Sequence, residues 1–215
     1  MSLRDCEYTL SECTLSEMEH LKPGLRQRQK RRTRHRLLQQ ALRLFARDGI
    51  VATPTAELAR AAGVSHGALF VHFGSRDELV AAAVEEFAGG VVRRIHQLTE
   101  GSAGVREVLE AHLEGLSEHE DFYVRLVMEG PVLPPYARST LVGIQSAIAF
   151  HLEIAARRDL AAGRLRRMEL PLLFNTWLGL LHHYLSNRDL FAPGESVLAR
   201  RGRELLDHYM SLITP

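Results

Sequence analysis

One stretch near the front of the chain, residues 54–76, limits what the chain can fold into more than any other. It contains two short helical patterns, each with apolar residues three to four positions apart. Gly63 stands between them, suited to the left-handed backbone that ends a helix, and Ser65 is a good N-cap for the second helix. The small side chain of Ala59 lets the two helices cross closely. Together these features predict a helix-turn-helix, whose second helix enters the major groove of DNA.

A strongly basic segment leads into this motif. Residues 22–36 carry eight lysines or arginines and no acid, whereas residues 1–20 carry five acids and one arginine. A basic run can be a solvated helix face, but beside a helix-turn-helix we interpret it as an arm that binds DNA phosphates. The acidic leader is expected to be solvated; the alternative is that it folds back on the basic segment and competes with DNA.

Composition excludes several other classes of protein. The chain has 215 residues, 46% of them hydrophobic, and a net charge of only +1, so affinity for nucleic acid must come from a local patch. No run approaches the roughly 18 apolar residues of a membrane span, and the polar N-terminus is no signal peptide. We therefore expect a cytoplasmic protein without a membrane partner. Cys6 and Cys13 are the only cysteines, so no disulfide framework holds the body together.

Catalytic and metal-binding motifs are missing from the sequence. Eleven histidines are present, but there is no HExxH zinc motif, no phosphate-cradling glycine loop and no serine nucleophile elbow. The His182-His183 pair lies in an apolar helix and is interpreted as a core or interface feature. We expect no enzyme, no catalytic residue, no cofactor and no metal site. A metal-sensing regulator is the weaker alternative.

The rest of the chain reads as helices, with no credible strand, which predicts an all-α protein. We divide it into an acidic extension (1–25), a helix-turn-helix domain with its basic arm (26–80) and a C-terminal helical effector-binding and dimerisation domain (81–215). A stiff proline-containing loop is expected at residues 131–136. The helices expected after the motif span about 75–99, 105–117, 120–129, 138–162, 169–187 and 195–213.

Residues 33–79 resemble the DNA-binding domain of the tetracycline-repressor (TetR) family of bacterial regulators. The resemblance covers about a fifth of the chain and departs from the family pattern at two positions. Phe70 stands where the family usually has tyrosine, which removes a hydroxyl commonly used on phosphate. Arg76 replaces a usual lysine, which keeps the charge but changes its geometry. The matching positions are Phe45, Gly49, Thr53, Ala59, Gly63, Val64, Ser65, Gly67, Leu69, Phe73, Ser75 and Leu79.

The second helix of the motif is expected to supply the base contacts. Ser65 and His66 at its start are the candidate polar base readers, and Val71 is placed to meet a thymine methyl group. Phe70 and His72 are expected on or beside the same face. The residues expected to hold phosphates are Arg31, Arg32, Arg34, Thr53, Thr55 and Arg76.

The last two helices are expected to form a dimer interface. Both carry wide apolar stripes that could face the chain's own core, but they also suit a four-helix bundle shared by two subunits, the dimerisation mode that the resemblance implies. A single helix-turn-helix reads only a half-site, which favours the dimer. The residues expected between the subunits are Trp177, Leu181, Tyr184, Leu205 and Tyr209.

The resemblance also implies a ligand cavity among the helices from about residue 79 to 185. The guest is expected to be hydrophobic or aromatic, with one carboxylate as an option, because Arg125 either escapes to solvent or meets an anion. We expect the protein to be a repressor that this ligand releases from its DNA operator. The alternative is a regulator of the same fold without a small-molecule effector, controlled by a partner or by its N-terminal tail. The expected lining is Phe122, Tyr123, Leu126, Met128, Tyr136, Ile148, Phe174 and Trp177, with His112, Arg125, His151 and Asn175 as its polar members.

Overall fold

A computed structural model describes the backbone of residues 5–98 and 103–215 and the side chains of residues 24–97 and 103–215. Every regular element in these ranges is a helix, which confirms the all-α prediction. The elements are α1 (Asp5–Asp48), α2 (Thr55–Ala61), α3 (His66–His72), α4 (Arg76–Leu98), α5 (Val105–Ser117), α6 (Glu120–Glu129), the 3₁₀ helix η1 (Gly130–Val132), α7 (Pro135–Ala161), α8 (Leu170–Ser186), α9 (Arg188–Phe191) and α10 (Val197–Ile213).

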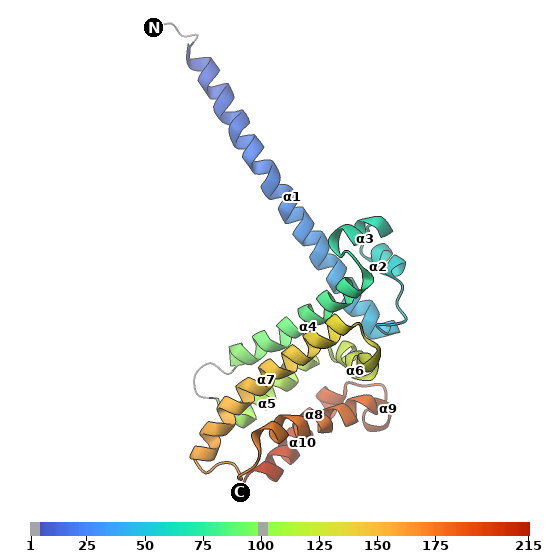
Figure 1. Ribbon diagram of the computed structural model, residues 1–215, viewed down its shortest axis with the longest axis vertical. Helices are drawn as coiled ribbons and strands as arrows, with labels where there is room; N and C mark the ends of the chain where they lie inside the picture. The colour runs from blue at the N-terminus through green and yellow to red at the C-terminus, as the bar shows by residue number, and fades with distance from the viewer. Residues whose placement is uncertain (1–4, 99–102) are drawn as a thin grey trace.

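The C-terminal part of α1 packs with α2 and α3 into a small unit at one end of the molecule (Figure 1). Burial in α1 begins at Leu37, and the side chains of residues 24–36 are exposed or half-buried. This part of α1 therefore projects from the body, which carries the basic segment into solvent (Figure 1). The predicted acidic extension, with Cys6 and Cys13, lies almost wholly outside the residues whose side chains are described.

The turn between α2 and α3 has the geometry that the sequence predicts. Gly63 has φ +65°, in the region that favours glycine, and the backbone N–H of Val64 donates to the carbonyl of Ala59. Ser65 caps α3, because its side-chain oxygen accepts a hydrogen bond from the N–H of Ala68 at 3.2 Å. The helix-turn-helix prediction is therefore confirmed.

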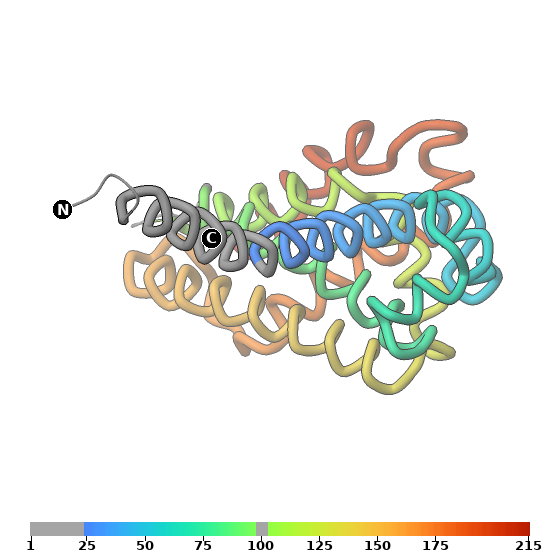
Figure 2. Tube along the Cα trace, turned by 90° about the horizontal axis from the view of Figure 1, so that it is seen from above, coloured from blue at the N-terminus to red at the C-terminus, as the bar shows by residue number. Residues whose placement is uncertain are grey.

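The remaining helices form the body below this unit. Helix α4 packs along both α5 and α7, and α8 and α10 pack together beside α6 and α5 (Figure 1). A view from above shows α2 and α3 gathered beside the C-terminal part of α1, over one end of the body (Figure 2). Trp177, Phe122 and Phe45 are among the largest fully buried side chains, so one core runs from the helix-turn-helix unit into the body.

Most of the expected helices are found within a residue or two of their predicted ends. Helix α4 runs through Gly89 and Gly90 without a break. Helix α7 starts three residues earlier than predicted, with Pro135 at its first turn, because proline at this position lacks only an N–H that a helix leaves unpaired anyway. The short helix α9 lies where only a turn was expected.

Helix α7 corrects one sequence-based expectation. By length and composition it is apolar enough to cross a membrane, although the sequence was judged to hold no such segment. It is a helix of the body, packed against α4, α5 and α8. Its outer face nevertheless leaves Val142, Phe150 and Ile154 exposed, and this face accounts for its apolar composition.

Candidate nucleic-acid interface and apolar pocket

One face of α3 is open to solvent. Ser65, His66 and Val71 are exposed, with Val71 71% accessible, and Phe70 is half-buried. His66 is held in place: its Nε2 lies 2.9 Å from the hydroxyl of Thr55, and its ring meets the Phe70 ring edge-on at 5.2 Å. The predicted base readers Ser65, His66 and Val71 are thus each exposed, and Thr55 of α2 holds the His66 ring in place.

The basic segment of α1 lies beside this surface, but its arginines are used differently. Arg31 and Arg32 are exposed and make no ion pair with any described side chain. Arg34 is half-buried: it donates to the carbonyl of His72 at 3.3 Å and lies 4.3 Å from the centre of the Phe73 ring. Arg34 therefore joins α1 to the end of α3, whereas Arg31 and Arg32 stay available for phosphates.

Two of the predicted phosphate ligands are turned inward. Thr53 is buried, and its hydroxyl donates to the carbonyl of Gly49 at 2.5 Å. The Arg76 guanidinium donates to the carbonyls of Thr53 (2.6 Å), Ile50 (2.6 Å) and Val51 (3.0 Å). These carbonyls lie in or next to the loop after α1, where no helix supplies their hydrogen bonds. Both side chains therefore stabilise that loop. The prediction that Thr53 and Arg76 bind phosphate is wrong for these conformations.

His72, at the end of α3, contains a buried polar atom. Its Nδ1 has no hydrogen-bond partner among the described residues. Burial, together with the charges of Lys30 and Arg34, lowers its pKa below the ordinary value. The ring is therefore neutral near pH 7. If His72 contacts DNA as predicted, it does so without a positive charge.

An apolar pocket lies inside the body, enclosed by α4, α5, α6, α7 and α8. It is closed: its volume is about 10 Å³, the size of a single water molecule. Four predicted ligand residues, His112, Tyr123, Ile148 and Phe174, line it. The lining residues that the sequence analysis missed are Phe87, Val91, Leu116, Leu141, Ile144, Gln145 and Leu178, and the apolar periodicity of α4 and α7 is the signal that could have found several of them.

Two hydrogen bonds connect the polar groups around this pocket. Trp177 Nε1 donates to His112 Nδ1 at 3.1 Å, and burial lowers the pKa of His112 to about 3. The Tyr123 hydroxyl lies 2.8 Å from His182 Nε2, and burial raises the pKa of that phenol and lowers the pKa of His182. All of these groups are thus uncharged at neutral pH.

The other predicted ligand residues lie elsewhere. Met128 and Tyr136 are 56% and 62% exposed, and Asn175 is also exposed. His151 stacks edge-on against His96, between α7 and α4. Three further predicted residues, Phe122, Leu126 and Trp177, are buried in the core without lining the pocket. The expected lining is therefore wrong for these seven positions, because helix faces that looked equivalent in sequence point to different neighbours.

Arg125 shows neither of the two outcomes expected for it, which were exposure to solvent or contact with an anion. It donates to the carbonyls of Ala46 (3.3 Å) and Arg47 (3.1 Å), the last turn of α1. One turn further along α6, the Glu129 carboxylate accepts from the N–H of Ile50 (3.2 Å) and of Val51 (2.8 Å). Helix α6 therefore holds the helix-turn-helix unit by two charged side chains, each paired with backbone groups that the end of α1 leaves unsatisfied.

The residues expected between two subunits are already buried inside one chain. Trp177 and Leu181 are inaccessible in the single chain, and Leu205 and Tyr209 are nearly so. The Tyr209 hydroxyl donates to the carbonyl of Leu173 within the same chain. These four residues belong to the core, so they cannot be the ones that become buried only on dimerisation; Tyr184 is half-buried against Phe191.

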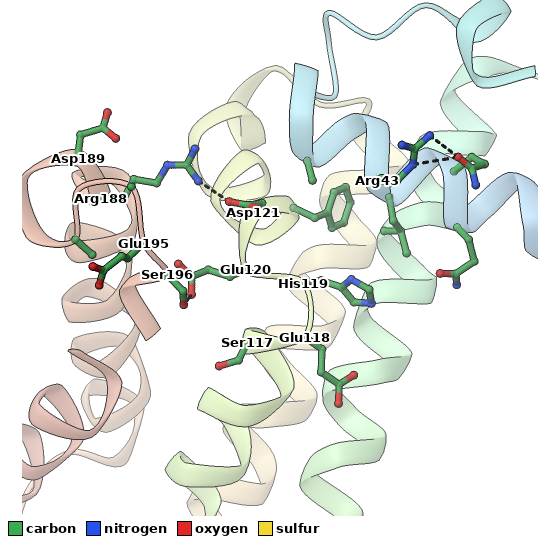
Figure 3. A pocket seen from close by; sticks show the side chains of 17 residues that line it. Arg43, Ser117, Glu118, His119, Glu120, Asp121, Arg188, Asp189, Glu195 and Ser196 are labelled. Atoms are coloured by element: carbon green, nitrogen blue, oxygen red, sulfur yellow. Dashed lines mark hydrogen bonds and ion pairs between the residues drawn. The ribbon is translucent and has the colours of Figure 1, made fainter. Parts of the chain in front are cut away.

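A separate polar cleft of about 790 Å³ lies where the end of α1, the α5–α6 junction and the segment before α10 meet (Figure 3). Arg188 bridges to Asp121 at 2.6 Å. The nearly buried Glu120 accepts from the N–H groups of Val197 (2.8 Å) and Leu198 (3.1 Å), which caps α10. Its polar side chains thus tie elements together, and the cleft is unlike the apolar cavity that was predicted.

Comparison with known proteins agrees with this geometry. Residues 37–83 match the model of "Bacterial regulatory proteins, tetR family". The chain is 34% identical over 102 residues to the HTH-type transcriptional regulator YerO of Bacillus subtilis (strain 168), covering 45% of this chain and 35% of YerO. It is 32% identical over 94 residues to the HTH-type transcriptional repressor Rv3405c of Mycobacterium tuberculosis, covering 44% of this chain and 46% of the repressor. It thus spans less than half the length of both relatives.

A solved structure has the same fold over most of the chain. The TetR family transcriptional regulator PfmR from Thermus thermophilus superimposes with a TM-score of 0.69 at 24% identity, over 81% of this chain and 97% of that one. An exposed helix seated on a second helix across a glycine turn defines the chain as a helix-turn-helix protein. More narrowly, its helix-turn-helix unit, residues 37–83, matches the tetR family of bacterial regulatory proteins. Its relatives are named as transcriptional regulators, in agreement with the expectation that it is not an enzyme.

Proposed function

We propose that this protein is a cytoplasmic transcriptional repressor that binds operator DNA as a homodimer and is released by a small apolar ligand. The observation that carries the DNA-binding part is the exposed face of α3 beside Arg31 and Arg32, two cations with no partner among the described side chains. The relative Rv3405c is named a repressor, which supports that direction of regulation.

The test separates phosphate contacts from base contacts. Replacing both Arg31 and Arg32 with glutamine removes two phosphate ligands per subunit. DNA affinity falls for every sequence, and the slope of log K against log salt becomes shallower by about 0.9 for each lost contact. The control is Arg200→Gln with Arg203→Gln, which removes the same charge from the exposed side of α10. An unchanged slope in the Arg31/Arg32 variant, measured by fluorescence anisotropy, contradicts the phosphate role.

Base reading is tested at His66. Its imidazole is fixed by Thr55 and exposed on α3, so His66→Ala removes a positioned hydrogen-bonding group without disturbing the core. The variant keeps its affinity for random DNA but loses preference for a selected operator, by about 1–3 kcal/mol per base pair that is read. Loss of random-sequence affinity instead would assign His66 to the DNA backbone.

The dimer interface lies on the outward face of α8, because the inward residues are already buried. Leu172 is exposed there, and Gly179 offers a flat surface for close helix packing. Nothing lies within 4 Å of a Cβ added at Gly179, so Gly179→Gln fits within one chain and blocks only a partner. The control Gly143→Gln is equally unhindered, on α7. Gly179→Gln produces monomers that have lost operator specificity; a variant that remains dimeric in sedimentation refutes this interface.

Ligand release acts through α6. Tyr123 lines the pocket, and the adjacent Phe122 lies between Phe87 of α4 (5.5 Å) and Phe45 of α1 (6.4 Å). Because the pocket is closed, a guest must displace its walls, and a shift of α6 moves the helix-turn-helix unit through Phe122 and the two charged contacts at its end. A ligand shifts this equilibrium only by its difference in affinity for the two states. The alternative, regulation without an effector, gains if no compound lowers operator affinity.

A further inference from the structure

His112 carries a hydrogen-bond donor with no partner among the described residues. Its side chain is 1% exposed, and its Nδ1 accepts the indole N–H of Trp177 at 3.1 Å. An indole nitrogen can only donate, so Nδ1 must be unprotonated. Burial lowers the pKa of His112 to about 3, so the ring is neutral at physiological pH. Its single N–H proton therefore lies on Nε2, which makes no hydrogen bond within the part of the chain that the structure describes.

This donor faces the closed pocket. His112 lines the pocket whereas Trp177 does not, so the Nε2 edge is the part of the ring left for the cavity. Gln145 of α7, another lining residue, is half-buried and its amide makes no hydrogen bond within the described chain. The Tyr123 hydroxyl is occupied by His182. The pocket lining thus includes two uncommitted polar groups, one from α5 and one from α7, among residues that are mainly apolar.

The same walls contain no ionised group. The described lining residues include no aspartate, glutamate, lysine or arginine, and Arg125 is bound to the end of α1. A carboxylate or an ammonium entering this site would lose its hydration without gaining a counter-charge. An ammonium would also meet the Nε2–H donor. A neutral oxygen, in contrast, accepts from that donor and gives it the hydrogen bond that no described residue supplies.

We propose that the pocket recognises an uncharged, mainly apolar molecule whose carbonyl oxygen accepts a hydrogen bond from His112 Nε2, and that it excludes carboxylates and amines. This inference rests on the proposed function, in that the pocket must open for a ligand. It removes the option of a carboxylate on the expected hydrophobic or aromatic guest, because Arg125, which would have met it, does not line the pocket.

The only tryptophan of the chain reports binding directly, because Trp177 is bonded to His112. We suggest titrating the full-length protein with two matched sets of probes and following Trp fluorescence. One set is 1-tetralone, tetralin and 1-naphthoate; the other is 2-decanone, decanoate and decylamine. In at least one set the ketone should bind most tightly, about 5- to 10-fold better than its hydrocarbon, acid or amine analogue.

Two variants assign the effect to the Nε2 donor. His112→Asn keeps an acceptor for Trp177 at the position of Nδ1 but has no group that reaches Nε2. It should lose the ketone preference while binding tetralin as before. His112→Gln places an amide N–H near Nε2 and should retain part of the preference. In addition, ¹⁵N NMR of the wild-type protein should show His112 neutral and protonated on Nε2, a test that needs no variant and no ligand.

The outcomes separate this inference from the function on which it rests. Tighter binding of the acid, amine or hydrocarbon, an undiminished preference in His112→Asn, or a proton on Nδ1 overturns the carbonyl assignment and leaves the repressor intact. If no probe of either set changes the fluorescence, the pocket as a ligand site is refuted together with this inference. The DNA-binding part is then judged by its own salt titration.

Discussion

Replacing Glu129 with alanine should weaken the attachment of the helix-turn-helix unit to α6 at a cost that the structure allows us to estimate. The carboxylate accepts two backbone hydrogen bonds, from Ile50 N at 3.2 Å and Val51 N at 2.8 Å. A hydrogen bond to a charged group contributes about 1.5–3 kcal/mol when shielded, but the Val51 contact is exposed and water replaces part of it. We expect a loss of about 2 kcal/mol in the free energy of unfolding.

Urea denaturation measures this loss, and an unchanged m-value shows that the folded and unfolded states stay comparable. Glu129→Gln should lose about 1 kcal/mol, because its one carbonyl oxygen can serve only one of the two N–H groups. Hydrogen exchange at the Ile50 and Val51 amides should accelerate in both variants. The control is Glu118→Ala, an exposed carboxylate without a hydrogen bond or ion pair among the described residues. A Glu129→Ala protein as stable as this control would refute the coupling.

Three further predictions follow from individual contacts. Gly49→Ala should destabilise by at least about 1 kcal/mol, because Gly49 has φ +97° and a Cβ there would lie 2.9 Å from Glu129 Oε1. The open helical Gly143→Ala should instead stabilise by about 0.5–1 kcal/mol, and urea denaturation measures both changes. Thr53→Val should cost about 1–3 kcal/mol of stability and leave the salt slope of DNA binding unchanged, because its hydroxyl is buried. His112 is protonated below about pH 6.5 in the unfolded chain but only near pH 3 in the folded chain. The free energy of unfolding should therefore fall as the pH drops from 6.5 to 3, by up to about 1.4 kcal/mol per pH unit. This contribution to the pH dependence should be absent from His112→Asn.

Local pattern was sufficient for the helices and for the helix-turn-helix motif. Gly63 and Ser65 define the turn because the left-handed backbone and the N-cap depend on residues within a few positions of each other. Helix ends from α4 to α10 follow in the same way from periodicity and from proline and glycine. His66 and Val71 of α3 are exposed, but their role as base readers stays a prediction.

Side-chain partners distant in sequence could be decided only by the tertiary structure. Arg76, Thr53 and Arg125 look like free polar groups in sequence, yet each satisfies backbone carbonyls at or beyond the end of α1. Those carbonyls are unpaired only because a helix ends there, and only the packing of α4 and α6 against that end brings the side chains within reach.

The same reason separates core from interface in the body. Trp177 and Leu181 lie in a helix that is apolar on nearly every side, so periodicity cannot tell which side faces the chain's own core. Helices α6, α7 and α10 pack against α8, and Gly179 is left exposed. The sequence determined that α8 is buried on one side at least. Which side is buried, and the hydrogen bond that Trp177 donates to His112, depend on tertiary contacts; that bond joins residues 65 positions apart.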